Sequence, residues 1–254
     1  MTHPQNTQSS SLTKSYIKLA KDEALWQTNL GEAISLVAQR SQKIINASRC
    51  SIWLFGNNKK ELHCQVMWNE VGCKQDLDIA IRSSDYPAYI TALEIDQTIN
   101  ANNALSDPRT QCFTDNYLIP NNIHALLDAT LRQEGAACGV ICFEQMHTPR
   151  NWTSEEISFA ASIADLLSQV LMFYSLRNSE LRYRTVFDST GDALIILRSG
   201  KVCDCNAAAL KLFRCNRQQL IGQPAEQFWQ FPDNKVHQVY ERFEWQQTRW
   251  DNTR

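Results

Sequence analysis

The sequence lacks a strong charge of either sign and any clear targeting segment. Its 25 basic and 27 acidic residues give a net charge of -2, so no long-range attraction to nucleic acid or to an anionic membrane is expected. The most apolar helical stretch, residues 157–176, contains Asp165 and Gln169, whereas a bilayer span needs about 20 residues with few charges. No secretory leader is recognisable. We therefore expect a cytoplasmic protein that binds neither nucleic acid nor a membrane.

Motifs of common catalytic sites are also missing. The chain contains no Gly-x-x-x-x-Gly-Lys phosphate loop, no His-Glu-x-x-His metal site and no Gly-x-Ser-x-Gly nucleophile elbow. These absences remove the most recognisable signatures of nucleotide hydrolysis, metal-assisted hydrolysis and acyl transfer. We therefore expect that the chain is not an enzyme and that any catalytic output domain lies beyond Arg254.

The nine cysteines do not have the pattern of a disulfide framework. They are scattered through apolar, strand-like segments, and reduced thiols are expected in a chain without a secretory leader. Cys203, Cys205 and Cys215 are close in sequence, but structural zinc usually takes four ligands in Cys-x-x-Cys pairs. Packing is therefore their expected role, and the sequence requires no metal and no cofactor.

Apolar and polar patterns predict an alternation of helices and strands. Residues 1–15 are mostly polar, which predicts a disordered tail. Apolar residues recur at helical spacing over residues 16–47 and predict one long amphipathic helix. Residues 86–116 are expected to be helical or irregular, with a helix start at Asp107-Pro108. A capping box at residues 153–156 begins another long helix. The predicted strands are residues 50–55, 62–68, 77–81, 126–131 and 137–143, with turns at residues 56–58 and 133–135.

This order of elements predicts an α+β fold in which helices lie on the faces of an antiparallel sheet. Several motifs then occur in the order found in GAF domains of bacterial signalling proteins. They are residues 107–110 (Asp-Pro-Arg-Thr), 126–131 (Leu-Leu-Asp-Ala-Thr-Leu), 139–144 (Gly-Val-Ile-Cys-Phe-Glu) and 152–161 (Trp-Thr-Ser-Glu-Glu-Ile-Ser-Phe-Ala-Ala). Residues 16–176 therefore resemble a GAF domain. The resemblance implies a small-molecule site between one face of the sheet and the segments that cover it.

The segment that follows resembles the first half of a PAS domain. Its first helix, first two strands and next helix match residues 182–187, 192–197, 202–206, 207–213 and 219–222. The resemblance implies a five-stranded sheet in the order second, first, fifth, fourth, third, with residues 243–245 as the third strand. We therefore expect residues 177–254 to hold a connecting helix and a partial PAS domain that lacks its last two strands. Residues 194–196 are then expected to expose an unpaired strand edge.

The GAF resemblance places the segment that covers a ligand at about residues 86–124. Ligand pockets favour aromatic side chains with a few polar groups. The alternative is that these aromatic residues fill a small core and bind nothing. The candidate pocket residues are Trp68, Tyr86, Tyr89, Cys112, Phe113, Tyr117 and His124.

Known cofactors of GAF domains find little support in the sequence. The Asn-Lys-Phe-Asp-Glu signature of cyclic-nucleotide-binding members is absent, and Cys112 is followed by Phe113, not by the histidine common in bilin-binding members. A haem would need an axial ligand such as His63 or His124, yet a lone histidine is more often simply hydrogen-bonded. The identity of a ligand, and whether one exists, therefore stays open.

Two long helices carry apolar residues at alternating intervals of three and four, the spacing of a helix seam. Two aligned copies of these seams would form a homodimer, while the alternative is that both stripes pack on their own sheet. The candidate dimer residues are Leu30, Ala33, Val37, Ile157, Ala164, Leu167, Leu171 and Tyr174.

Three functional hypotheses follow. The first is a signal-transduction sensor that binds a small ligand or partner and transmits through a dimeric helical linker. Its output domain would be, for example, a diguanylate cyclase of cyclic-di-GMP signalling or a histidine kinase of a two-component system. The second is a dimerisation scaffold without a ligand. The third is a thiol-based redox enzyme of GAF fold, because Cys64, Cys73 and Cys112 lie in segments comparable to those of GAF domains that reduce free methionine sulfoxide.

Overall fold

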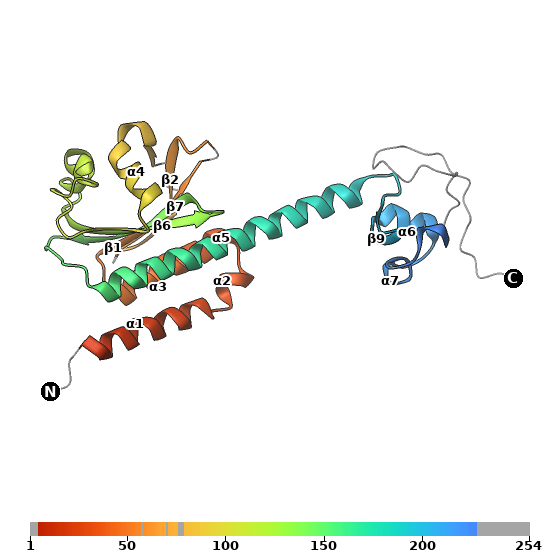
Figure 1. Cartoon of the computed structure of the whole chain (residues 1–254), viewed down its shortest axis with the longest axis horizontal. Helices are drawn as coiled ribbons and strands as arrows, with labels where there is room; N and C mark the ends of the chain where they lie inside the picture. The colour runs from red at the N-terminus through yellow and green to blue at the C-terminus, as the bar shows by residue number, and fades with distance from the viewer. Residues whose placement is uncertain (1–4, 57, 70, 76–78, 228–254) are drawn as a thin grey trace. The chain divides into compact units, whose positions relative to one another are not determined.

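The computed structural model describes residues 5–56, 58–69, 71–75 and 79–227. The chain divides into two compact units, residues 1–176 and 177–254. Helix α5 (Ser154–Ser189) is continuous and contributes to both units (Figure 1).

Three helices begin the first unit: α1 (Gln5–Ala20), α2 (Ala24–Gln27) and α3 (Leu30–Ile45). The prediction of a disordered tail over residues 1–15 is therefore wrong for residues 5–15, because Leu12, Tyr16 and Leu19 pack against the core. The prediction of one helix over residues 16–47 is also wrong. Asp22 accepts a hydrogen bond from the amide of Ala24 and Asn29 accepts one from the amide of Glu32, both at 2.9 Å. The Asn29 side chain thus caps the start of α3, whereas the N-cap residue of α2, Glu23, makes no side-chain cap hydrogen bond.

An antiparallel sheet forms the centre of the first unit. Its strands follow the order β3-β2-β1-β7-β6-β5, and β4 also pairs with β2. The two predicted hairpins, β1–β2 and β6–β7, are confirmed, as is the α+β class. Of the strand expected at residues 77–81, residues 80 and 81 belong to β4, whereas residues 76–78 lie outside the described residues. Strands β3 and β5 were not predicted. The bounds are β1 Arg49–Phe55, β2 Glu61–Asn69, β3 Gly72–Gln75, β4 Ala80–Arg82, β5 Thr98–Ala101, β6 Ile123–Gln133 and β7 Ala136–Met146.

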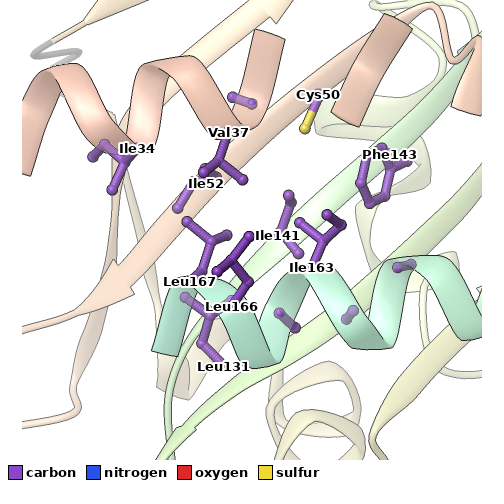
Figure 2. Close-up of a cluster of buried hydrophobic side chains, with 14 of the residues drawn as sticks. Ile34, Val37, Cys50, Ile52, Leu131, Ile141, Phe143, Ile163, Leu166 and Leu167 are labelled. Atoms are coloured by element: carbon purple, nitrogen blue, oxygen red, sulfur yellow. The ribbon is translucent and has the colours of Figure 1, made fainter. Parts of the chain in front are cut away.

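One face of this sheet carries the main apolar core. Helices α3 and α5 lie against it (Figure 1), and side chains from both helices meet those of β1, β6 and β7 (Figure 2). The candidate dimer residues belong to this core: Ala33, Val37, Ala164 and Leu167 are at most 1% exposed, and Leu171 and Tyr174 are also buried. Leu30 and Ile157 pack against the same cluster. The prediction that these residues form a dimer interface is therefore wrong, because their stripes cover their own sheet.

Helix α5 starts as its sequence predicts. The Thr153 hydroxyl accepts a hydrogen bond from the amide of Glu156, and the Glu156 carboxylate accepts one from the amide of Thr153. This reciprocal capping box satisfies two amide groups that a helix start leaves free. By length and composition alone α5 could cross a membrane, but half of its most apolar window is buried inside the unit, as in the core helix of a globular domain.

The second face of the sheet is covered by residues 86–122, which we call the cover segment. It contains helix α4 (Pro87–Ile95), strand β5, a 3-10 turn (Gln111–Phe113) and a π turn (Thr114–Leu118). No helix starts at Asp107-Pro108 as expected; the Asp107 carboxylate instead accepts hydrogen bonds from the amide and guanidinium of Arg109. The Asp107 side chain therefore fixes a turn, because its hydrogen-bond partner Arg109 is only two residues further along the chain.

A buried ion pair connects the cover segment to the sheet. Arg49 and Glu144 lie opposite each other on β1 and β7 and form a salt bridge with side chains that are 7% and 2% exposed. The hydroxyl of Tyr117 in the π turn accepts a hydrogen bond from Arg49 at 2.9 Å and donates one to Glu144 at 2.5 Å. The three groups satisfy one another, so the π turn is held at a defined place above the sheet.

The second unit is described from residue 177 to residue 227. After the end of α5 it contains strands β8 (Ile195–Arg198) and β9 (Lys201–Cys205) and helices α6 (Ala207–Phe213) and α7 (Arg217–Leu220). This order agrees with the first half of a PAS domain. In this part β8 pairs with β9 alone, and Ile196 is 40% exposed, so the open strand edge at residues 194–196 stays a prediction. The third strand expected at residues 243–245 lies outside the described residues.

Gly139 generates the first prediction. A Cβ atom at this position of β7 would overlap the carbonyl oxygen of Trp53 and lie 2.7 Å from the Cδ2 of Leu54. We expect Gly139→Ala to lower the free energy of unfolding by about 2 kcal/mol, because β1 must move away. The control is Gly31→Ala in α3, where the nearest atom is 3.4 Å away. Urea unfolding that shows equal stability for both variants would contradict this account.

The ion pair generates the second prediction. Arg49→Met leaves the Glu144 carboxylate buried without its cation, and we expect a loss of about 3 kcal/mol of unfolding free energy. The double variant Arg49→Met/Glu144→Leu removes the unpaired charge, so it should recover part of that loss. Urea unfolding at neutral pH checks both. A double variant that is less stable than Arg49→Met alone would show that the pair does not act as described.

Candidate functional site

A concavity lies between the sheet and the cover segment of the first unit. It is lined by strands β1, β2, β4, β6 and β7, by α4 and by the two turns of the cover segment. The lining residues are Trp53, Leu62, Ile81, Tyr89, Phe113, Tyr117, Leu126, Asp128, Val140, Cys142 and Glu144.

The alternation of side chains along β6 and β7 brings polar groups into this concavity. On β6, Leu127 and Ala129 face the core of α3 and α5, whereas Asp128 between them faces the cover segment. On β7, Cys142 and Glu144 face the same way as Asp128. A strand presents alternate residues to opposite faces, so two carboxylates and a thiol lie on the side of the sheet opposite to the main core.

Aromatic rings from the cover segment form the opposite wall. The ring of Phe113 stacks on Tyr86 with centroids 4.4 Å apart and meets the edge of Tyr89 at 4.9 Å. The ring of Tyr117 lies 6.4 Å from that of Phe113. These are favourable edge and offset arrangements, so the rings support each other whether or not a ligand is present.

Asp128 is the least satisfied polar group of the site. Its side chain is buried, with the residue 2% exposed, and Oδ2 accepts a hydrogen bond from the Tyr89 hydroxyl at 2.7 Å. The other oxygen, Oδ1, is buried and has no hydrogen-bond partner. Burial raises the pKa of Asp128 to about 7, although interactions with the Tyr89 hydroxyl and the Cys142 thiol act in the opposite direction. Near neutral pH this carboxyl group is therefore divided between its neutral and charged forms.

Glu144, in contrast, has a complete set of partners. One of its oxygens pairs with Arg49 and the other accepts from Tyr117. Burial, followed by the charge of Glu144, raises the pKa of the Tyr117 hydroxyl well above its usual value, so this hydroxyl remains a donor. The two carboxylates of the site thus differ in role: Glu144 is part of the framework, and Asp128 keeps free hydrogen-bonding capacity.

The free space next to these groups is small. The concavity measures about 380 Å³ when its open mouth is included, but the space available to the centres of water molecules is only about 30 Å³. That space holds roughly two waters. A ligand of a few heavy atoms fits this arrangement, whereas a larger one requires movement of the cover segment.

The thiols near the site are not activated. Burial raises the pKa of Cys142 well above its usual value, and it raises that of Cys64 to about 12. Cys112 is exposed, but burial of its thiol also raises its pKa. A reactive cysteine needs a lowered pKa, so these environments do not favour thiol chemistry.

Three predicted pocket residues, Tyr89, Phe113 and Tyr117, line the concavity. Tyr86 supports it from behind by stacking on Phe113. Three other candidates are not brought together with them. The Cys112 thiol points to the carbonyl of Arg109 at 3.8 Å, His124 pairs with Asn122 at 3.2 Å, and Trp68 packs against the opposite core.

A β-bulge explains the position of Trp68. Trp53 pairs with Cys64 and Ile52 pairs with Val66, so Gln65 is an extra residue in β2. Leu62 and Cys64 therefore face the cover segment, whereas Val66 and the later Trp68 face the core of α3 and α5. An inserted residue reverses the alternation of a strand, and no local pattern in this sequence marks it.

Neither a metal nor a haem is supported by the geometry. Among the described residues, no group of three His, Cys, Asp or Glu side chains is placed to hold a metal ion. The His63 side chain is 46% exposed and lies 3.5 Å from the carboxylate of Glu61, while His124 is bonded to Asn122. Neither histidine lines the concavity.

The sequence reasoning missed the polar residues Asp128, Cys142 and Glu144. Each belongs to a motif that carried the family resemblance, but none was assigned to the site. The signal was present, because strict alternation from the buried Leu127 places Asp128 on the other face. A carboxylate inside a strand of otherwise apolar residues indicates a polar site or a buried pair.

Comparisons with known proteins agree with this architecture. The sequence matches the GAF domain family over residues 29–171 and a PAS domain family over residues 181–248. No curated protein matches it. Both family matches are to sensory domains.

Several solved structures are similar. The GAF domain of a phosphoenolpyruvate-protein phosphotransferase from Coxiella burnetii has a TM-score of 0.53 and 16% identity, covering 67% of this chain and 98% of that one. The phytochrome photosensory core module of Stigmatella aurantiaca has a TM-score of 0.55 and 14% identity, covering 73% and 40%. The chromophore-binding domain of a bacteriophytochrome from R. palustris has a TM-score of 0.53 and 17% identity, covering 70% and 64%.

At these identities the structures support the fold alone. The family match is stronger evidence, because it covers more than half of the 254 residues and contains every strand of the sheet around the concavity. The chain belongs to the GAF domain family.

Proposed function

We propose that this chain is a sensor module of a signal-transduction protein. Its GAF domain binds a small ligand in the concavity, and α5 transmits the bound state to the PAS segment and to an output domain outside this chain. The observation that carries the proposal is the buried Asp128 carboxylate, which lines the concavity and has one oxygen without a hydrogen-bond partner. Burial of an unpaired polar group is unfavourable, so a purely structural core would not need one here.

The proposed module is a homodimer, and the support for this comes from the exposed residues of α5. Met172, Leu176, Tyr183 and Val186 are 53%, 71%, 38% and 67% exposed. With Ser179 between them they follow intervals of four, three, four and three residues, the spacing of a two-helix seam. We call these four residues the α5 stripe. It replaces the buried seam expected from the sequence.

Two alternatives account for the data less fully. A ligand-free scaffold explains the α5 stripe but gives no role to Asp128. A thiol-based redox enzyme needs reactive cysteines, and the environments of Cys64, Cys112 and Cys142 oppose thiolate formation.

Sensory GAF and PAS domains also make an output such as a diguanylate cyclase or a histidine kinase a natural partner. We include that output, the cyclic-di-GMP or two-component context and a cytoplasmic location in the proposal.

Filling the free space tests the ligand part of the proposal. We expect members of a panel of small polar metabolites to raise the melting temperature of the full chain. Val140→Leu adds one methylene to a lining residue and should abolish these shifts. Val71→Leu, at a residue that is 96% exposed, is the matched control and should keep them. Native mass spectrometry of the purified protein shows whether a molecule is retained. A chain that binds nothing in either assay would support the scaffold.

The α5 stripe generates a prediction for assembly. Leu176→Glu places a charge on the stripe, and we expect the dimer to dissociate at least about tenfold more readily. Leu181→Glu is the matched control, because Leu181 is 56% exposed but lies nearly opposite the stripe on the helix. Sedimentation velocity of the full chain measures both. A wild-type chain that is monomeric at high concentration, or equal weakening by both variants, would refute the interface.

A further inference from the structure

The chemistry of the concavity restricts which ligands it can accept. Among its charged lining groups, Glu144 is fully paired with Arg49 and Tyr117, whereas Oδ1 of Asp128 has no partner. When Asp128 is ionised, the site carries an excess negative charge on a residue that is 2% exposed. A bound group that donates a hydrogen bond and carries a positive charge would give Oδ1 a partner and would neutralise the excess negative charge.

The groups around Asp128 do not supply that charge themselves. Tyr89 on α4 donates to the other oxygen, and the Cys142 thiol on β7 is a weak donor. Arg109 is the nearby cation, and it lowers the pKa of Asp128, but its guanidinium is paired with Asp107 at 2.8 Å. Glu144 has the opposite effect, because its negative charge raises the pKa. The charge of Asp128 is therefore left without a direct counterion.

The remaining surface of the site favours a cation of organic character. Four of its lining residues are aromatic: Trp53, Tyr89, Phe113 and Tyr117. Aromatic rings attract ammonium groups through the negative charge of their faces, and this attraction is largest where water is excluded. An inorganic cation would instead need several oxygen ligands. The unpartnered Oδ1 of Asp128 supplies a single one.

We propose that the concavity binds a small organic ammonium ion that donates a hydrogen bond to Oδ1 of Asp128 and packs its carbon atoms against Phe113 and Tyr117. This inference rests on the proposed function, since it names the class of ligand for the same site. The space of roughly two waters restricts the ion to a few heavy atoms, such as methylammonium or dimethylammonium.

The test titrates the full chain with methylammonium and dimethylammonium chloride, with acetamide as a neutral probe and acetate as an anionic one. Amide chemical shifts in NMR spectra report the site of binding. The expected result is binding of the two amines at about millimolar affinity, as is usual for so few atoms, with shifts around residues 89, 128 and 142 and little response to acetamide or acetate.

Variants identify the group responsible. Asp128→Asn keeps the size of the side chain but removes its charge, and it should weaken amine binding at least about tenfold. Asp165→Asn, at an exposed carboxylate of α5, should leave binding unchanged. Tyr89→Phe keeps the ring and removes a donor that lowers the pKa of Asp128, so it should shift the pH dependence of amine binding to higher pH. Circular dichroism confirms that each variant is folded.

The pH dependence supplies an independent measure. An ammonium ion binds the ionised form of Asp128, whose pKa in the free protein is about 7. Affinity should therefore be full above that pKa and fall at least about tenfold between pH 8 and pH 5.5 as the carboxyl group is protonated. Asp128→Asn should remove this dependence. Binding that strengthens as the pH falls would overturn the proposal.

The outcomes separate this inference from the proposed function. If acetamide binds as well as the amines, or if Asp128→Asn binds amines like the wild type, the ammonium class is wrong although the site still binds ligands. If the amines do not bind but another small molecule shifts residues around Asp128, the inference is again wrong and the sensor proposal stands. If no probe and no panel compound binds, both fail.

Discussion

The alternation of side chains along residues 125–131 of β6 and 140–144 of β7 is the constraint on which the first unit depends. Leu127 and Ala129 on one strand, and Ile141 and Phe143 on the other, form the core beneath α3 and α5. The residues between them must then face the cover segment, whatever their polarity. One face of the sheet is therefore apolar and covered by α3 and α5. The same alternation places the carboxylates on the other face.

The two carboxylates on that face are both buried, but they differ in how fully they are paired. Glu144 lies opposite Arg49 in the register of β1 and β7, and the Tyr117 hydroxyl completes its hydrogen bonds, so its charge stabilises the position of the cover segment. Asp128 has the Tyr89 hydroxyl as a donor and, besides it, the weakly donating Cys142 thiol. If stability were the only requirement, the domain would be more stable with an apolar residue in place of Asp128. Its presence therefore points to function.

Much of the fold could be predicted because its signals are local. The β6–β7 hairpin follows from its turn, where Glu134 and Gly135 both have positive φ, and α5 follows from its capping box. Non-local features were not predictable in this way. The extra Gln65 in β2 moves Trp68 to the other face. Breaks at residues 21–23 and 28–29, where the Asn29 side chain caps α3, divide one expected helix into three. For the site, aromatic residues were identified by type, but Asp128 is recognised only once the register of β6 is known.

The account depends on Asp128 being a buried carboxyl group with an open oxygen and no counterion in the free protein. The most direct measurement is an NMR titration of its side-chain carboxyl carbon in the unliganded full chain. The account predicts a pKa near 7 for Asp128, because burial disfavours the charged form. A pKa near the ordinary value of about 4 would show that the group is hydrated or paired, and it would contradict the central claim.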